Sequence, residues 1–176
     1  MRKLFVSALM MLTLSIGGIS VFATQLETSS SINVNENVVI DGEVGDVIEV
    51  GDCIFEIVDD FTINNQTRAS QKGFSITLSG TEYSQSFSVT DDMPYAKVYI
   101  DNSQGPADII FTITKGSPTG TVVSGSDVTV KKGKKVTVRS TNAWPASTYY
   151  ANFTSPNASM SASASSRIAS TLSELG

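Results

Sequence analysis

The sequence predicts an all-β protein: an antiparallel β-sandwich, jelly-roll-like or Greek-key, preceded by an acidic N-terminal extension. From Gly73 onward, short runs that alternate apolar and polar residues recur about every ten residues, and turn residues separate them. Ser, Thr, Val, Ile, Tyr and Phe are abundant, and charged residues are sparse. No long helix-period pattern follows the apolar N-terminal run. These three observations favour two stacked sheets, each with one buried face.

The N-terminus has the pattern of a secretory signal peptide. Met1, Arg2 and Lys3 precede an apolar run from Leu4 to about Ile19, and small residues lie before a cleavage point after Ala23. An uncleaved anchor is the alternative, but the run is short for a bilayer span. We therefore expect a secreted, extracellular protein with no transmembrane segment after signal removal. The short signal, single cysteine and lysine-rich hairpin are typical of a Gram-positive bacterium.

The charges divide the rest of the chain into two parts. Residues 24–67 contain ten acidic residues and no basic one, whereas residues 68–176 contain ten basic and seven acidic residues. The acidic part is interpreted either as a permanent extension that maintains solubility, or as a propeptide that covers a basic face and is removed near Arg68. Polar residues surround Arg68, as in exposed linkers that proteases cut.

The expected organisation is therefore a signal peptide (1–23), an acidic extension or propeptide with short β segments (24–69), and a β-sandwich domain (70–176). Gly-Asp and Asp-Gly pairs interrupt the β runs between Val38 and Ile63, which predicts two or three small strands there. The clearest hairpin covers residues 127–139, because its valines alternate with polar residues and Gly133 lies in the turn. In the domain we expect strands over residues 74–78, 83–89, 96–100, 108–114, 121–123, 127–130, 135–139, 147–154 and 159–168.

The reactive side chains do not suggest an enzyme. The absence of histidine excludes Ser-His, Cys-His and His-metal arrangements. Cys53, the single cysteine, cannot form an internal disulfide, and its neighbouring acids favour the protonated thiol. We expect no cofactor. Calcium is the one metal that the sequence suggests, because Asp91-Asp92 and Asp101-Asn102 offer oxygen ligands on turns.

Two groups of residues are candidate ligand-binding surfaces. The first is the lysine tip of the hairpin, which could contact an anionic envelope polymer or glycan or, alternatively, could protect an exposed edge: Lys131, Lys132, Lys134 and Lys135. The second is aromatic and could stack on sugar rings: Trp144, Tyr149 and Tyr150. A core position for Trp144 is the alternative, and only one of two consecutive tyrosines in a strand can face outward.

These features predict a secreted, non-catalytic β-sandwich protein that acts as a cell-envelope or extracellular binding module. Nucleic acid is not an expected partner of a secreted protein, and nothing in the sequence specifies an oligomeric state. The alternative is a secreted effector or bacteriocin-like protein whose acidic leader, residues 24–68, is removed to release the basic β domain.

Overall fold

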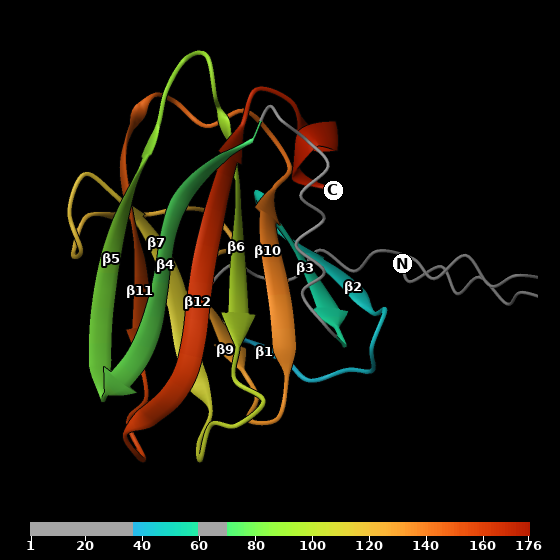
Figure 1. Cartoon of the computed structure of the whole chain (residues 1–176), viewed down its shortest axis with the longest axis vertical. Helices are drawn as coiled ribbons and strands as arrows, with labels where there is room; N and C mark the ends of the chain where they lie inside the picture. The colour runs from blue at the N-terminus through green and yellow to red at the C-terminus, as the bar shows by residue number, and fades with distance from the viewer. Residues whose placement is uncertain (1–36, 60–69) are drawn as a thin grey trace, which may run out of the picture. The chain divides into compact units, whose positions relative to one another are not determined.

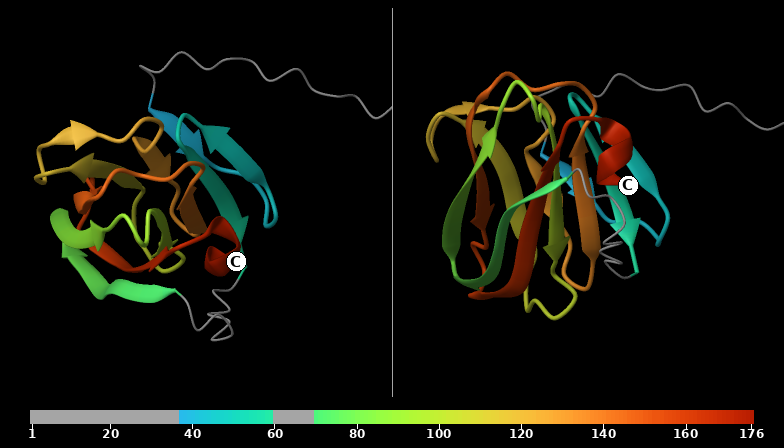
Figure 2. Two further views of the ribbon diagram at one scale, coloured as in Figure 1. Left: turned by 90° about the horizontal axis from the view of Figure 1, so that it is seen from above. Right: turned by 45° about the horizontal axis from the view of Figure 1, so that its top comes forward.

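The computed structural model describes residues 37–59 and 70–176. The expected signal peptide and both expected processing positions, Ala23 and Arg68, lie outside these residues. Twelve strands form two sheets that pack face to face, as Figures 1 and 2 show. The predicted fold class, an antiparallel-rich β-sandwich, is confirmed.

Sheet A contains six strands and one parallel pair. Its order is β1 (Val38–Ile40), β9 (Val128–Val130), β7 (Ile109–Lys115), β11 (Ser147–Thr154) and β5 (Glu82–Val89), with β8 (Thr121–Val122) also paired to β7. The pair β1–β9 is parallel, and the other neighbours are antiparallel.

Sheet B is antiparallel throughout. Its order is β2 (Val47–Val50), β3 (Cys53–Val58), β10 (Lys135–Ser140), β6 (Tyr95–Asp101), β12 (Met160–Ala169) and β4 (Gln71–Gly80). The 3₁₀ helix η1 (Leu172–Leu175) follows β12 and contacts β12 and β6. Among the described residues, η1 is the only helix, and it is far too short to cross a membrane.

The core lies between the sheets and is built from the alternating residues of both. Several strands bury alternate side chains, as in β3, where Cys53, Phe55 and Ile57 point inward. Aromatic rings contact one another in series across the core, from Phe74 to Phe87 to Tyr149, with centroid distances of 6.0 Å at both steps. Burial of these large side chains supplies the main stabilisation of the fold.

Residues 38–58, which the sequence assigns to the acidic extension, are strands of the sandwich itself. β3 lies inside sheet B and pairs with β10 along its whole length, while β1 pairs with β9 of sheet A. Ile40 and Phe55 are completely buried in the same core as the later strands. The expected boundary at residue 69 therefore does not separate two structural units among the described residues, because the apolar positions of the acidic segment complete the core.

Candidate functional site

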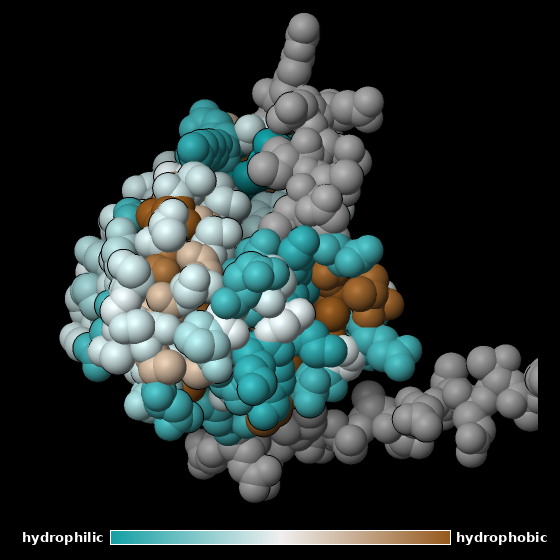
Figure 3. Space-filling view, turned by 60° about the horizontal axis from the view of Figure 1, so that its bottom comes forward, coloured by the Kyte–Doolittle hydropathy of each residue, from teal (hydrophilic) through white to brown (hydrophobic). Residues whose placement is uncertain are grey.

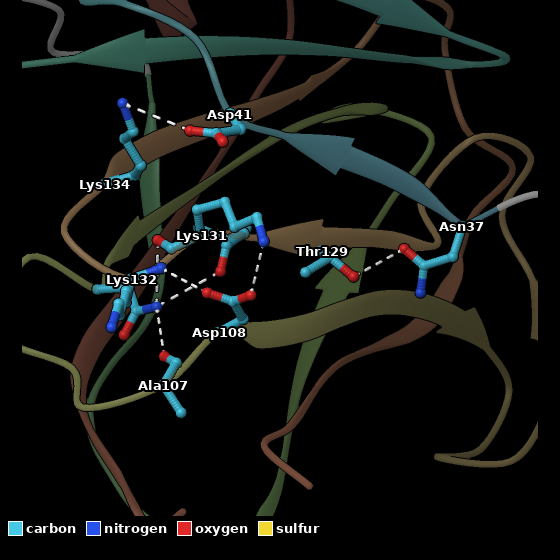
Figure 4. A network of polar contacts seen from close by, with 10 residues as sticks. Asn37, Asp41, Ala107, Asp108, Thr129, Lys131, Lys132 and Lys134 are labelled. Carbon is cyan, nitrogen blue, oxygen red and sulfur yellow. Dashed lines mark hydrogen bonds and ion pairs between the residues drawn. The ribbon is translucent and has the colours of Figure 1, made fainter. Parts of the chain in front are cut away.

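The lysine tip is held by acidic residues of the same chain. The Lys131 ammonium lies 3.0 Å from Asp108 Oδ2, and the Lys132 backbone N–H donates to Asp108 Oδ1 at 3.0 Å (Figure 4). These two hydrogen bonds, the backbone one first, lower the pKa of Asp108. Lys134 lies 3.8 Å from Asp41 and donates to the Gly42 carbonyl. The charges of Lys131 and Lys134 are thus matched by carboxylates of the same chain.

Asn102 fixes the backbone of this tip from inside. Its side chain is fully buried, and Nδ2 donates to the carbonyls of Ala107, Val130 and Lys131 at 3.0–3.4 Å. Its backbone N–H donates to Lys134, and its carbonyl accepts from Gly133. The tip is therefore a rigid, internally bonded turn, with Lys132 exposed and Lys135 placed opposite Asp101 on β6.

The two expected calcium turns do not meet. Asp91-Asp92 precedes β6 and Asp101 is its last residue, so the other six residues of the strand separate the two groups. Asp101 instead accepts hydrogen bonds from the backbone and hydroxyl of Ser103. Among the described residues, no group of three or more Cys, Asp or Glu side chains is placed to hold a metal ion.

The aromatic stacking surface that the sequence suggests is not formed. Trp144 and Tyr149 are 7% and 2% exposed, and their rings pack together with centroids 5.0 Å apart. The backbone N–H of Trp144 donates to the Pro94 carbonyl, and Tyr149 OH donates to the Pro145 carbonyl, so the Trp144 backbone and the Tyr149 ring are both fixed at this end of the core. Only Tyr150 faces outward, and it is half-buried. Two of the three candidate residues, Trp144 and Tyr149, therefore complete the core and do not form one exposed surface with Tyr150, which agrees with the alternative of a core position for Trp144.

A different group of charged residues comes together on the outer face of sheet B. Strand register places Arg139 of β10 opposite Lys97 of β6, Lys97 opposite Arg167 of β12, and Arg167 opposite Lys72 of β4. Four cations from four neighbouring strands therefore form one line perpendicular to the strands, which we call the cation row. Adjacent strands are about 4.8 Å apart, so the row spans about 14 Å.

The cation row is electrostatically unusual. Like charges directly opposite each other destabilise a sheet. Between described residues, the two ion pairs within 4.0 Å are at the lysine tip, and neither involves a member of the row. Arg167 donates to the hydroxyl of Ser70 at 3.0 Å, and no Asp or Glu side chain in the described part of the chain lies within ion-pair distance of it. The row therefore concentrates positive charge that a bound anion would stabilise.

Lys97 lies at the centre of the row and is buried. Its ammonium donates to the carbonyls of Leu175 and Gly176 at 3.3 and 2.9 Å, and it lies 5.3 Å from the centre of the Tyr99 ring. Burial lowers its pKa, and nearby Arg139 lowers it further, while Glu56 acts in the opposite direction. The C-terminal segment thus covers the centre of the row and leaves Arg139, Arg167 and Lys72 accessible in varying degree.

Sequence reasoning missed the cation row because its members are scattered along the chain. The four residues lie on strands that are neighbours only after folding, and each is an isolated polar position in its own alternating run. No family model matches the chain, and comparisons with curated proteins and with solved structures give no match.

Proposed function

We propose that the protein is a secreted, non-catalytic module that binds an anionic polymer of the cell envelope or its surroundings. The observation that carries the proposal is the cation row on sheet B. An array of four positive charges about 14 Å long fits a chain that bears repeated negative charges better than it fits a single small ion. The polymer would run across the strands and contact the accessible members in turn.

The location of the binding surface differs from the one that the sequence suggests. The lysine tip satisfies much of its own charge through Asp108 and Asp41, so an anion there would have to compete with these carboxylates. Among the described residues, no Asp or Glu side chain lies within ion-pair distance of the row. Of the two basic surfaces, the row therefore has the greater capacity to gain free energy from an anionic partner.

The module would bind its partner without catalysing a reaction. Cys53 is fully buried, and burial followed by the charge of Asp52 raises its thiol pKa to about 12, so the reactive thiolate is strongly disfavoured. Release of residues 70–176 by removal of the acidic segment is not part of this proposal, because β1, β2 and β3 would be lost from both sheets.

The test measures binding of residues 24–176 to lipoteichoic acid and to polyphosphate over a range of salt concentrations. The row variant carries Lys72→Gln, Arg139→Gln and Arg167→Gln, and the matched control carries Lys115→Gln, Lys132→Gln and Lys135→Gln. We expect the row variant alone to lose at least about tenfold in affinity and to show a shallower salt dependence. Equal losses in both variants would mean that net charge, rather than the row, determines binding.

A further inference from the structure

The cation row ends at a cavity beside Arg139. The cavity has a volume of about 480 Å³ and lies on the outer face of sheet B, between the β2–β3 hairpin and η1. It is lined by three apolar side chains, by Arg139 and by polar groups of the hairpin and the C-terminal segment: Val47, Ile54, Glu56, Leu172, Ser173 and Gly176. Arg139 therefore belongs both to the cation row and to the lining of this cavity.

The register of β3 and β10 determines how the charged groups are placed. Ile54 lies directly opposite Arg139, and Glu56 lies opposite Thr137, so Glu56 and Arg139 are diagonal neighbours on the same face. They are not within ion-pair distance of each other. The guanidinium can therefore bind an anion while the Glu56 carboxylate accepts hydrogen bonds from a different part of the same ligand.

The apolar lining is accessible to a ligand. Val47 belongs to the edge strand β2, faces the same side as Glu56 and is 61% exposed. Figure 3 shows that the described surface in that view is mostly hydrophilic, with apolar residues gathered in small patches. The large apolar side chains that are exposed in the described chain are four valines: Val39, Val44, Val47 and Val122. Val47 therefore offers an accessible apolar contact at the lining of the cavity.

The C-terminal segment that forms the opposite wall is fixed in place. Leu175 is 3% exposed, and the carbonyls of Leu175 and Gly176 accept from Lys97. The Glu174 carboxylate accepts from the backbone N–H groups of Ser170 and Thr171, so the turn is held at its start as well. The wall that carries Leu172 and Ser173 is therefore preorganised, which lowers the entropic cost of binding.

We propose that this cavity binds a terminal acidic sugar, a hexuronate unit, of the anionic polymer. The sugar carboxylate would pair with Arg139, its hydroxyl groups would donate to Glu56 and exchange hydrogen bonds with Ser173, and its C–H face would rest on Val47 and Ile54. This ligand class matches the combination of one cation, hydroxyl acceptors and an apolar wall, which inorganic phosphate would not use. The inference rests on the proposed function, since it identifies the end of the polymer that the row would guide.

The experiment titrates residues 24–176 with glucuronate, glucose and acetate, followed by backbone amide NMR shifts, and measures binding of a polyuronate in parallel. We expect glucuronate to shift the amides of Ile54, Glu56 and Ser173 and to bind at least about tenfold more tightly than glucose or acetate. Val47→Glu adds a repelling carboxylate to the cavity at an exposed edge position, and should weaken glucuronate binding by a similar factor. Val122→Glu is the matched control, because it makes the same change at an exposed valine of sheet A.

The outcomes separate this inference from the proposed function. If polyuronate binding depends on the row, but glucuronate does not bind and Val47→Glu has no effect, the proposed cavity site is overturned and the proposed function of the row stands. If glucuronate binds and Val47→Glu abolishes this binding, but the polymer does not bind, the cavity site is supported and the proposed function of the row is overturned. Equal weakening by Val47→Glu and Val122→Glu overturns the cavity, since it shows a general charge effect. Absence of binding to both ligands overturns both proposals.

Discussion

Cys53 shows how one buried residue links stability to pH. Its thiol is completely buried, and its pKa is raised from 9.0 to about 12, mainly by burial. Below pH 9 the thiol is protonated in both folded and unfolded chains, so the contribution to stability is complete. As the pH rises from 9 towards 12, the Cys53 thiol ionises only in the unfolded chain. The contribution of the thiol to the free energy of unfolding is therefore progressively lost until the pH reaches the folded pKa.

We expect Cys53 to lower the free energy of unfolding by about 1.4 kcal/mol in total when the pH rises from 7.5 to 10, and most of this loss falls between pH 9 and pH 10. Urea unfolding of the wild-type protein and of Cys53→Ala at pH 7.5, 9 and 10 measures this, and the difference between the two should shrink by that amount. Subtracting the values for Cys53→Ala isolates the contribution of the thiol. A constant difference across these pH values would show that Cys53 ionises normally in the folded state.

Trp144 and Asn102 show what sequence can and cannot tell about single residues. A core position for Trp144 was one of two alternatives, and choosing between them requires knowing that its backbone bonds to Pro94 at the end of the sandwich. Asn102 follows a strand and is a good turn residue, but its function as the buried anchor of a hairpin that begins almost thirty residues later depends on tertiary contacts. Alternation predicts which side chains point inward, and it does not predict polar contacts between distant segments.

At the level of elements, the β2–β3 hairpin is essential for closing sheet B. β3 lies between β2 and β10, and its removal would expose the edge of β10 and uncover the core at Val136 and Val138. Loss of β1 would expose β9 in the same way. Cleavage near Arg68 would therefore produce two fragments of one folded unit rather than a free domain.

We expect a chain cut after Arg68 to remain a complex of both fragments, because strand pairing and shared burial hold them together. The measurement is co-elution of residues 24–68 with residues 69–176 in size-exclusion chromatography after specific cleavage at an engineered site. Residues 69–176 expressed alone should lack dispersed NMR signals and bind a hydrophobic dye. Dissociation of the fragments with retention of a folded 69–176 domain would restore the propeptide interpretation.

The positions of most strands can be predicted from the sequence, whereas the order of the strands within the two sheets cannot. Alternating residues and turn signals identify β4, β5, β6, β7, β11 and β12 within a few positions, and also the short strands of the acidic segment. The order of strands depends on which edges meet after collapse. The parallel pairing of β1 with β9 leaves no local signal in Val38–Ile40. The cation row follows from that order, so it was equally inaccessible to sequence reasoning.

On the scale of the whole molecule, charge arrangement is more informative than net charge. The chain carries a net charge of −5 and yet places four cations in one line, while its acidic residues are concentrated in the segment that contains β1, β2 and β3. The lysine tip is recognisable in the sequence because its residues are consecutive or nearly so. In the folded chain, Asp108 and Asp41 pair with lysines of this tip. The cation row, in contrast, is assembled from four separate strands and has no ion pair among the described residues.

We expect salt to stabilise the folded protein while it weakens binding to the polymer. Ions screen the repulsion along the row, and the same screening weakens attraction to a polyanion. Lys72→Gln removes one exposed member of the row, so it should reduce the salt-induced gain in unfolding free energy by about 0.2–1 kcal/mol, whereas Lys132→Gln should not. Thermal unfolding between low and high sodium chloride concentrations measures both. An equal salt response in the two variants would show that the row is not repulsive.

The strand order also determines when the protein can fold. Val38 pairs with Val128, Phe55 pairs with Val138, and Ile76 pairs with Ala164, so sheet B is complete only when the last strand of the chain is present. Sheets built from such distant pairs fold slowly, because large loops close before their contacts form. Because β12 pairs with both β4 and β6, the middle of sheet B cannot close before the last strand of the chain has been synthesised. Folding of the sandwich is therefore expected to follow, rather than accompany, synthesis of the chain.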